Sequence, residues 1–205
     1  MFFHIAAMDI CRPLLGLDLP PTLPGLGLTP LHIFSASAEQ LTRLVNLFYN
    51  CFPSSTKTGT WMPALVYTVN YVLRHKAKEH AQAVLYFCIN TLFELGAQYQ
   101  HVGRIVRALS AIALRNEVIS IRTAAMIDKK IGEKQSHHLW RDPVPMTFVL
   151  DLDWTRKDSV GDPEDAQVDA LAVDFACRLA IDEFTLMGDA ADLDGFAKVG
   201  TSSKE

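Results

Sequence analysis

Apolar residues recur along most of the chain at the three- and four-residue spacing of an amphipathic helix. Phe87 and Phe93 lie on other faces of the most regular segment, so that helix is apolar on most sides. We expect it to be central in the core and to end near Gly96. Its main stripe consists of Ala81, Val84, Leu85, Cys88, Ile89, Leu92 and Leu95.

Further stripes predict helices on both sides of this one. One helix has Pro63 in its first turn and Thr60 as its candidate N-cap; another opens at Ser37, where SAEQ reads as a capping box. A last helix opens near Pro163. The sequence therefore predicts an all-α, irregular multi-helix domain. The residues expected to face the core are Ala38, Leu41, Val45 and Phe48; Met62, Leu65, Val66, Val69, Val72 and Leu73; Val102, Ile105, Val106, Leu109 and Ala113; and Val168, Leu171, Ala172, Phe175 and Leu179.

The 205 residues divide into four expected parts. These are a helical body over residues 1–140, an extended acidic connector over 141–164, a C-terminal helix over 165–186 and a disordered acidic tail over 187–205. Segments 15–30 and 53–60 are rich in Pro, Gly, Ser and Thr and read as surface loops.

Charge is distributed unevenly along the chain. Residues 1–141 hold 14 Lys and Arg against 8 Asp and Glu, whereas residues 142–205 hold 5 against 15. The net charge of −4 argues against nonspecific DNA binding, which needs a concentrated basic surface. The basic row Arg104, Arg107 and Arg115 reads as a solvated helix face.

The stretch MTFVLDLDWT, Met146–Thr155, raises an enzymatic alternative. An apolar run before Asp-x-Asp-x-Thr resembles the site of haloacid-dehalogenase-type phosphatases, with Asp151 as nucleophile and Asp153 as its acid partner. That chemistry also needs a magnesium ion held by further acids and a cation for the phosphate. The 50 residues after Thr155 offer one helical pattern and an acidic tail, without further strands. We therefore read both aspartates as exposed acids and expect no catalytic residue and no enzyme.

The metal-binding residue types do not cluster either. His75 with His80, and His137 with His138, have spacings that do not share one helical face. The cysteines lie far apart on apolar helical faces, which favours reduced, buried thiols over disulfides or zinc. We expect no metal and no cofactor. The cysteines are Cys11, Cys51, Cys88 and Cys177.

The sequence also bears on location. No uninterrupted apolar run reaches the roughly eighteen residues that span a bilayer. The N-terminal MFFHIAAMDICRP lacks the basic region and cleavage site of a secretory signal. We expect an intracellular protein without a membrane partner.

Four segments in order resemble a known family: HIAAMDICRPLLG, SASAEQLTRLVNLFYNCFP, WMPALVYTVNYVL and HAQAVLYFCINTLFELGAQYQHVGRIVRALSAIAL. They are similar to the regulatory "middle homology" region of fungal zinc-cluster transcription factors. The resemblance covers residues 1–115 well and 165–186 weakly, and its signature contains no catalytic residue. The matching positions are His4, Arg12-Pro13, Phe48-Tyr49, Pro63, Leu95-Gly96 and Arg104.

The resemblance implies a nuclear protein that regulates transcription by RNA polymerase II. Its partners would be other transcription proteins or further copies of itself, and a small-molecule effector stays open. The family's six-cysteine DNA-binding module is missing from this sequence, so we expect neither zinc nor specific DNA binding. Met1 falls inside an expected interior helix, so we expect an N-terminally incomplete domain that exposes an apolar surface. The residues expected to lose their packing partners are Ile5, Met8, Ile10 and Leu14.

Two further readings stay open from the sequence. In the first, the chain is a free-standing helical protein that binds a small apolar or aromatic ligand between Trp61, Tyr67, Tyr71 and Phe87. The second concerns residues 182–196, where apolar residues alternate with acids as in amphipathic activation segments. A frayed chain end is the alternative for that segment.

Overall fold

The computed structural model describes residues 1–15, 17, 28–52, 61–95, 101–135, 150 and 163–181. The described residues form helices without any strand, so the predicted all-α fold is confirmed. The helices are α1 (Phe2–Cys11), α2 (Pro30–Cys51), α3 (Met62–His75), α4 (Lys78–Leu95), α5 (Val102–Arg115), α6 (Ile121–Gln135) and a C-terminal helix over residues 168–181. Two short 3₁₀ turns are η1 (Arg12–Leu14) and η5 (Pro163–Ala166).

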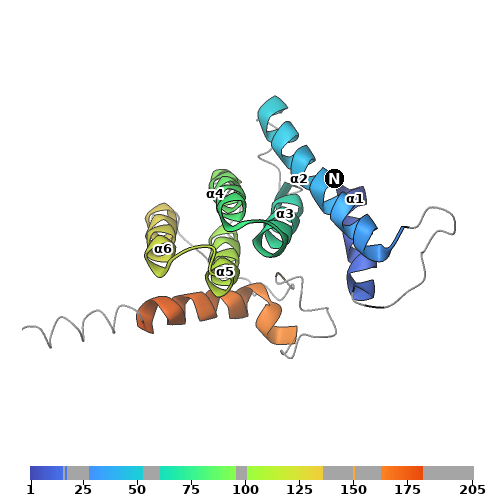
Figure 1. The fold of residues 1–205 in the computed structure, drawn as a ribbon. Helices are drawn as coiled ribbons and strands as arrows, with labels where there is room; N and C mark the ends of the chain where they lie inside the picture. The colour runs from blue at the N-terminus through green and yellow to red at the C-terminus, as the bar shows by residue number, and fades with distance from the viewer. Residues whose placement is uncertain are drawn as a thin grey trace, which may run out of the picture.

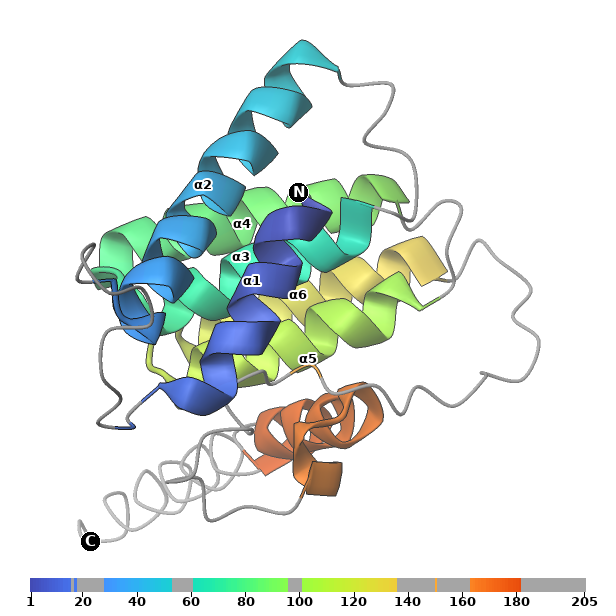
Figure 2. The ribbon, with the colours of Figure 1, turned by 90° about the vertical axis from the view of Figure 1, so that its right-hand side faces the viewer.

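Neighbouring helices in the chain pack as pairs, and the pairs stand side by side. The helix α1 contacts α2, α3 contacts α4, and α5 contacts α6. Further contacts of α3 with α2 and with α5 join the pairs into one row. The pair α1–α2 forms one end of the row and α6 the other (Figure 1). The C-terminal helix crosses the row on the outer side of α5 (Figures 1 and 2).

The core is formed largely by the predicted stripes. Leu85 and Leu92 of α4 and Ile105 and Leu109 of α5 are fully buried. The most completely enclosed helix is α5 rather than α4, because α3, α4, α6 and the C-terminal helix all pack around α5. Leu150, from the predicted extended connector, is also fully buried, and its N–H donates to the Ala166 carbonyl at 2.8 Å.

The start of α2 differs from the prediction. The helix begins at Pro30, and the Thr29 hydroxyl accepts a hydrogen bond from the His32 N–H at 3.3 Å. Ser37 is therefore a buried interior residue, and the predicted capping box is wrong. Thr29-Pro30 is a start signal of its own, and Phe34 extends the buried stripe upstream of Ser37. Thr60, Gly96 and residues 182–186 lie outside the described part of the chain.

The expectation for the first helix holds for its apolar surface, because Phe2, Phe3 and Ile10 are exposed, but it is wrong for Met8 and Ile5. Met8 is buried, and Ile5 packs against the core, because α2 covers this side of α1. Of the four residues expected to lose their partners, Ile10 is highly exposed.

Among the described helices, none combines the length and apolar character that a bilayer crossing requires.

Candidate functional site

The cysteines and histidines of the described residues form no group of three or more potential metal ligands. All four thiols are free: Cys11 and Cys88 are buried as predicted, whereas Cys51 and Cys177 are exposed. The prediction failed for Cys51 because it lies at the last position of α2, and for Cys177 because it lies on the outer side of the C-terminal helix. Asp151, Asp153, His137 and His138 lie outside the described residues.

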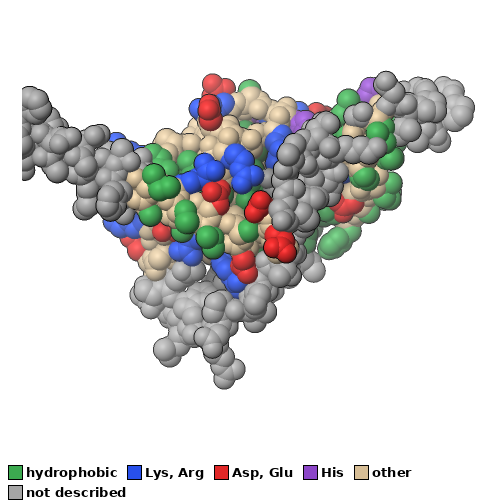
Figure 3. All heavy atoms as spheres, turned by 90° about the horizontal axis from the view of Figure 1, so that it is seen from below, with side chains coloured by type: hydrophobic (Ala, Val, Ile, Leu, Met, Phe, Trp, Pro, Cys, Tyr) green, Lys and Arg blue, Asp and Glu red, His purple; other side chains and the backbone are tan. Residues whose placement is uncertain are grey.

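The arginine row of α5 is the first polar feature that joins separate elements. Arg104 Nη1 lies 2.9 Å from Asp169 Oδ1, and Arg107 Nε lies 2.7 Å from Asp128 Oδ1. Arg115 Nη2 lies 3.6 Å from Asp174 Oδ2. The row was predicted to be a solvated face. Arg115 is exposed as predicted, whereas Arg104 and Arg107 are partly covered where the row borders the C-terminal helix and α6. Basic and acidic side chains accordingly lie close together on the side seen from below (Figure 3).

A signal for this contact is present in the sequence. The body is basic and the C-terminal part acidic, and opposite charges on two amphipathic helices favour their packing side by side. Asp169 and Asp174 flank the buried side of the C-terminal helix, where Val168, Leu171 and Phe175 enter the core. The apolar residues supply the contact area, and the charge pairs set the orientation.

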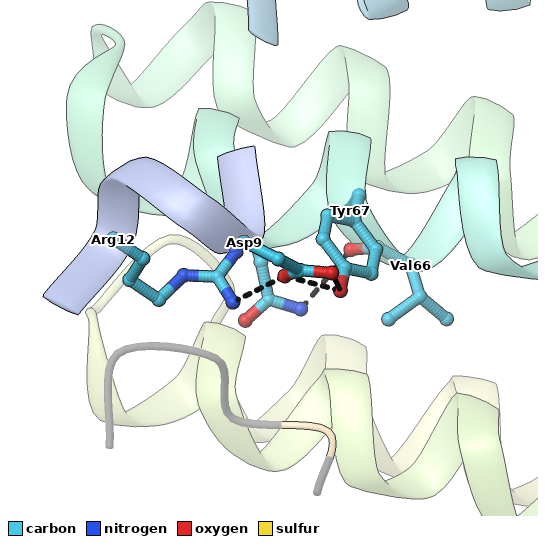
Figure 4. Close-up of polar contacts among 5 residues, drawn as sticks. Asp9, Arg12, Val66 and Tyr67 are labelled. Carbon is cyan, nitrogen blue, oxygen red and sulfur yellow. Dashed lines mark hydrogen bonds and ion pairs between the residues drawn. The ribbon is translucent and has the colours of Figure 1, made fainter. Parts of the chain in front are cut away.

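A second polar cluster, Asp9–Arg12–Tyr67, ties the N-terminal helices to α3 (Figure 4). The Tyr67 hydroxyl donates to the Asp9 carboxylate, with distances of 2.6 and 2.8 Å to its two oxygens. Arg12 Nη1 donates to Asp9 Oδ1 at 3.1 Å. The Arg12 guanidinium carbon lies 5.3 Å from the Tyr67 ring centre and 5.9 Å from that of Phe34. One arginine therefore contacts side chains of α1, α2 and α3.

Burial sets the electrostatics of this cluster. Arg12 is only 5% exposed, so its charge needs a partner, and Asp9 supplies it. Burial, followed by the hydrogen bond to the Asp9 carboxylate, raises the pKa of Tyr67 to about 12. Tyr67 is therefore a neutral donor at physiological pH rather than a base or nucleophile. The cluster fastens helices together, and its three charged or polar groups already bind one another.

The raised pKa of Tyr67 gives a test of this arrangement. The neutral phenol is favoured in the folded state, so its contribution is complete below the ordinary pKa of 10.0 and is lost as pH rises toward about 12. We expect the stability of the wild-type chain to fall more steeply over this pH range than that of Tyr67→Phe. Urea denaturation at pH 8, 10 and 11.5 measures both. Equal slopes for the two proteins would contradict the hydrogen bond.

The four aromatic residues predicted to line a ligand pocket contact different partners. Trp61 packs on Phe48, with ring centres 5.2 Å apart, and Phe87 meets the Tyr49 ring edge to face at 4.9 Å. Tyr71 stacks on His75 at 4.9 Å, and Tyr67 binds Asp9. Trp61, Phe87 and Tyr67 therefore contact residues of other helices, whereas Tyr71 stacks within α3. A ligand pocket shared by the four rings stays a prediction.

No protein-family model matches the chain, and no curated protein or solved structure matches it. The positions that carry the family resemblance can still be located in the fold. Most of those in the described residues lie where helices meet or where a helix begins or ends. They are Arg12 in the cluster with Tyr67, Phe48 and Tyr49 against Trp61 and Phe87, Pro63 in the first turn of α3, buried Leu95 at the end of α4, and Arg104 against Asp169.

Proposed function

We propose that this chain is the regulatory and protein-interaction part of a fungal transcription factor, acting on RNA polymerase II transcription in the nucleus without a zinc-cluster module of its own. One observation carries the proposal. The diffuse signature shared with the middle homology region falls on residues that hold helices together, such as Arg12, Phe48 and Tyr49. A signature of this kind is what a family defined by a helical scaffold, rather than by a catalytic site, would retain.

The polar chemistry of the described residues supports an interaction module over an enzyme. Tyr67 is held neutral, and Asp9 accepts hydrogen bonds from Tyr67 and Arg12, so neither is free to transfer a proton to a substrate. The partners we propose are other transcription proteins or further copies of this chain, and a small-molecule effector remains open.

We also propose that the chain alone does not bind DNA specifically. A phosphate-binding surface needs lysines and arginines that are available to the backbone of the duplex. In the row on α5, Arg104, Arg107 and Arg115 each bind an aspartate of the same chain. Any residual binding is expected to disappear at moderate salt.

A tethering experiment tests the proposed function. Residues 1–205 fused to an unrelated DNA-binding domain are expected to change the output of a reporter gene in a fungal host. A second fusion carries Phe184→Ala, Leu193→Ala and Phe196→Ala, which leave the charge of the acidic segment unchanged. Loss of the effect in this variant assigns activity to the acidic segment, and its persistence assigns activity to the helical body.

The readout needs a control for folding. Leu92→Ala removes core packing, and Met126→Ala changes an exposed side chain on α6, so we expect only the second fusion to keep any activity of the helical body. Both fusions are compared at equal nuclear abundance. A folded, nuclear wild-type fusion that leaves the reporter unchanged would count against the proposal.

A further inference from the structure

The outer side of α1 is the most apolar exposed helix face near the α1–α2 end of the molecule. Phe3 is 77% exposed, Ile10 is 69% exposed and Phe2 is 62% exposed, and Ala6 and Pro13 are exposed as well. We call these five residues the α1 outer face. Phe3, Ala6, Ile10 and Pro13 follow one another at intervals of three and four residues, so they form one continuous stripe.

The α1 outer face includes one ion pair, because the Asp9 side chain, 46% exposed, lies between Ala6 and Pro13 and binds Arg12. Within α1 and η1 the carboxylate and guanidinium groups belong to Asp9 and Arg12, and these bind each other. The Asp9 carboxylate is further occupied by the Tyr67 hydroxyl. The Asp9–Arg12 pair is neutral as a whole, so a second copy of this face can approach without net like-charge repulsion.

The position of α1 leaves this face accessible. The opposite side of the helix, with Met8 and Cys11, packs into the core and against α2. The pair α1–α2 lies at one end of the row of helices, far from α6 (Figures 1 and 2). Seen from below, apolar side chains gather at the end of the molecule where α1 lies (Figure 3).

The area of the face fits an interface between two copies. Buried aromatic side chains contribute about 150–250 Å² each, so Phe2 and Phe3 at their observed exposure offer roughly 200–350 Å² per copy. If these rings were fully covered, two copies would bury at most roughly 400–700 Å² from the phenylalanines alone. Ile10, Ala6 and Pro13 bring the total toward the roughly 1,000 Å² at which specific interfaces begin.

We propose that the α1 outer face is the interface of a two-fold symmetric homodimer, in which α1 of one copy lies antiparallel across α1 of the other. A two-fold interface uses the same patch on both copies, so it closes at two and leaves no apolar edge for further growth. Ala6 is small and lies in the middle of the stripe, which places the crossing point of the two helices there. This inference rests on the exposed residues of α1 and is independent of the proposed role in transcription.

Sedimentation velocity of the full chain over a range of concentrations tests the proposal. We expect a reversible monomer–dimer equilibrium that Phe3→Ser with Ile10→Ser weakens by at least about tenfold, because each change occurs twice in a two-fold interface. The matched control is Met126→Ser with Val173→Ser, which alters two side chains of 63% exposure on α6 and the C-terminal helix. Circular dichroism melts confirm that both variants fold.

Cysteine cross-linking tests the crossing point. In a chain with Cys51→Ser and Cys177→Ser, Ala6→Cys is expected to give a disulfide-linked dimer under mild oxidation, since facing cysteines need Cα atoms within about 7 Å. Ala125→Cys, at an exposed position of α6, is expected to give none. A chain that stays monomeric at all concentrations, a dimer weakened equally by the Met126/Val173 control, or equal cross-linking at the two positions would overturn the proposal. If the chain were monomeric, the partner of the α1 outer face would be a molecule other than a second copy of this chain.

Discussion

Leu92→Ala is expected to lower the free energy of unfolding by about 2–5 kcal/mol, and Leu85→Ala by a similar amount. Both side chains are fully buried on the α4 stripe that faces the rest of the bundle, so truncation removes apolar contacts and leaves a cavity that rigid neighbouring helices fill only in part. A loss of this size is a large fraction of the roughly 5–15 kcal/mol that stabilises a typical domain. Urea denaturation followed by circular dichroism measures it.

Exposed positions provide the comparison for these variants. Met126→Ala on α6 is expected to change stability by no more than about 0.5 kcal/mol, because its side chain already lies largely in water. Asp151→Asn and Asp153→Asn are likewise predicted to cost little. Small, equal losses at all of these positions would show that the core is centred elsewhere.

Phe175→Ala is expected to release the C-terminal helix while the rest of the bundle stays folded. Phe175 is among the largest fully buried side chains, and its loss removes about 3–5 kcal/mol from the contact between residues 168–181 and α5. Hydrogen exchange is the suitable measurement, because it resolves local opening. Amides of residues 171–181 should exchange much faster in the variant, and amides of α3 and α4 should keep their protection.

The charge pairs of the same helix serve as the control for Phe175→Ala. Asp169→Asn removes the ion pair with Arg104, but both side chains are partly exposed, so we expect a loss of at most about 1 kcal/mol. If Asp169→Asn opened the helix as much as Phe175→Ala, the docking would depend on charge rather than on apolar burial. If neither variant changed exchange in residues 171–181, the helix would not be anchored through this face.

The helix interiors could be predicted because their apolar spacing is a local property of the sequence. The stripe of α5 is buried as expected, and so is that of α4 apart from the partly buried Val84. Helix ends were less predictable, since SAEQ at Ser37 and Thr29-Pro30 are both valid start signals and only the packing of Phe34 decides between them. The family resemblance and its implied function remain proposals.

The polar contacts could not be predicted from periodicity alone. Arg104 and Asp169 are 65 residues apart, and Asp9 and Tyr67 are 58 apart, so their pairing depends on how the helices are arranged. The same reason explains the exposure of Ile10 and the burial of Met8, which lie on opposite sides of one helix. A helical pattern gives the residues of each face but not which face a neighbour will cover.

The pairing of neighbouring helices has a consequence for the order in which the chain folds. The contacts α3–α4 and α5–α6 close short loops, and α1–α2 closes the longer connection between Cys11 and Pro30; closing such loops costs little chain entropy, and all three pairs can form while the polypeptide is still being synthesised. The C-terminal helix differs, because its partner Arg104 precedes Asp169 by 65 residues and α5 must be in place to receive it. We expect residues 168–181 to join last, so a nascent chain that lacks them exposes the side of α5 that carries Arg104 and Arg115, whereas Arg107 already binds Asp128 of α6.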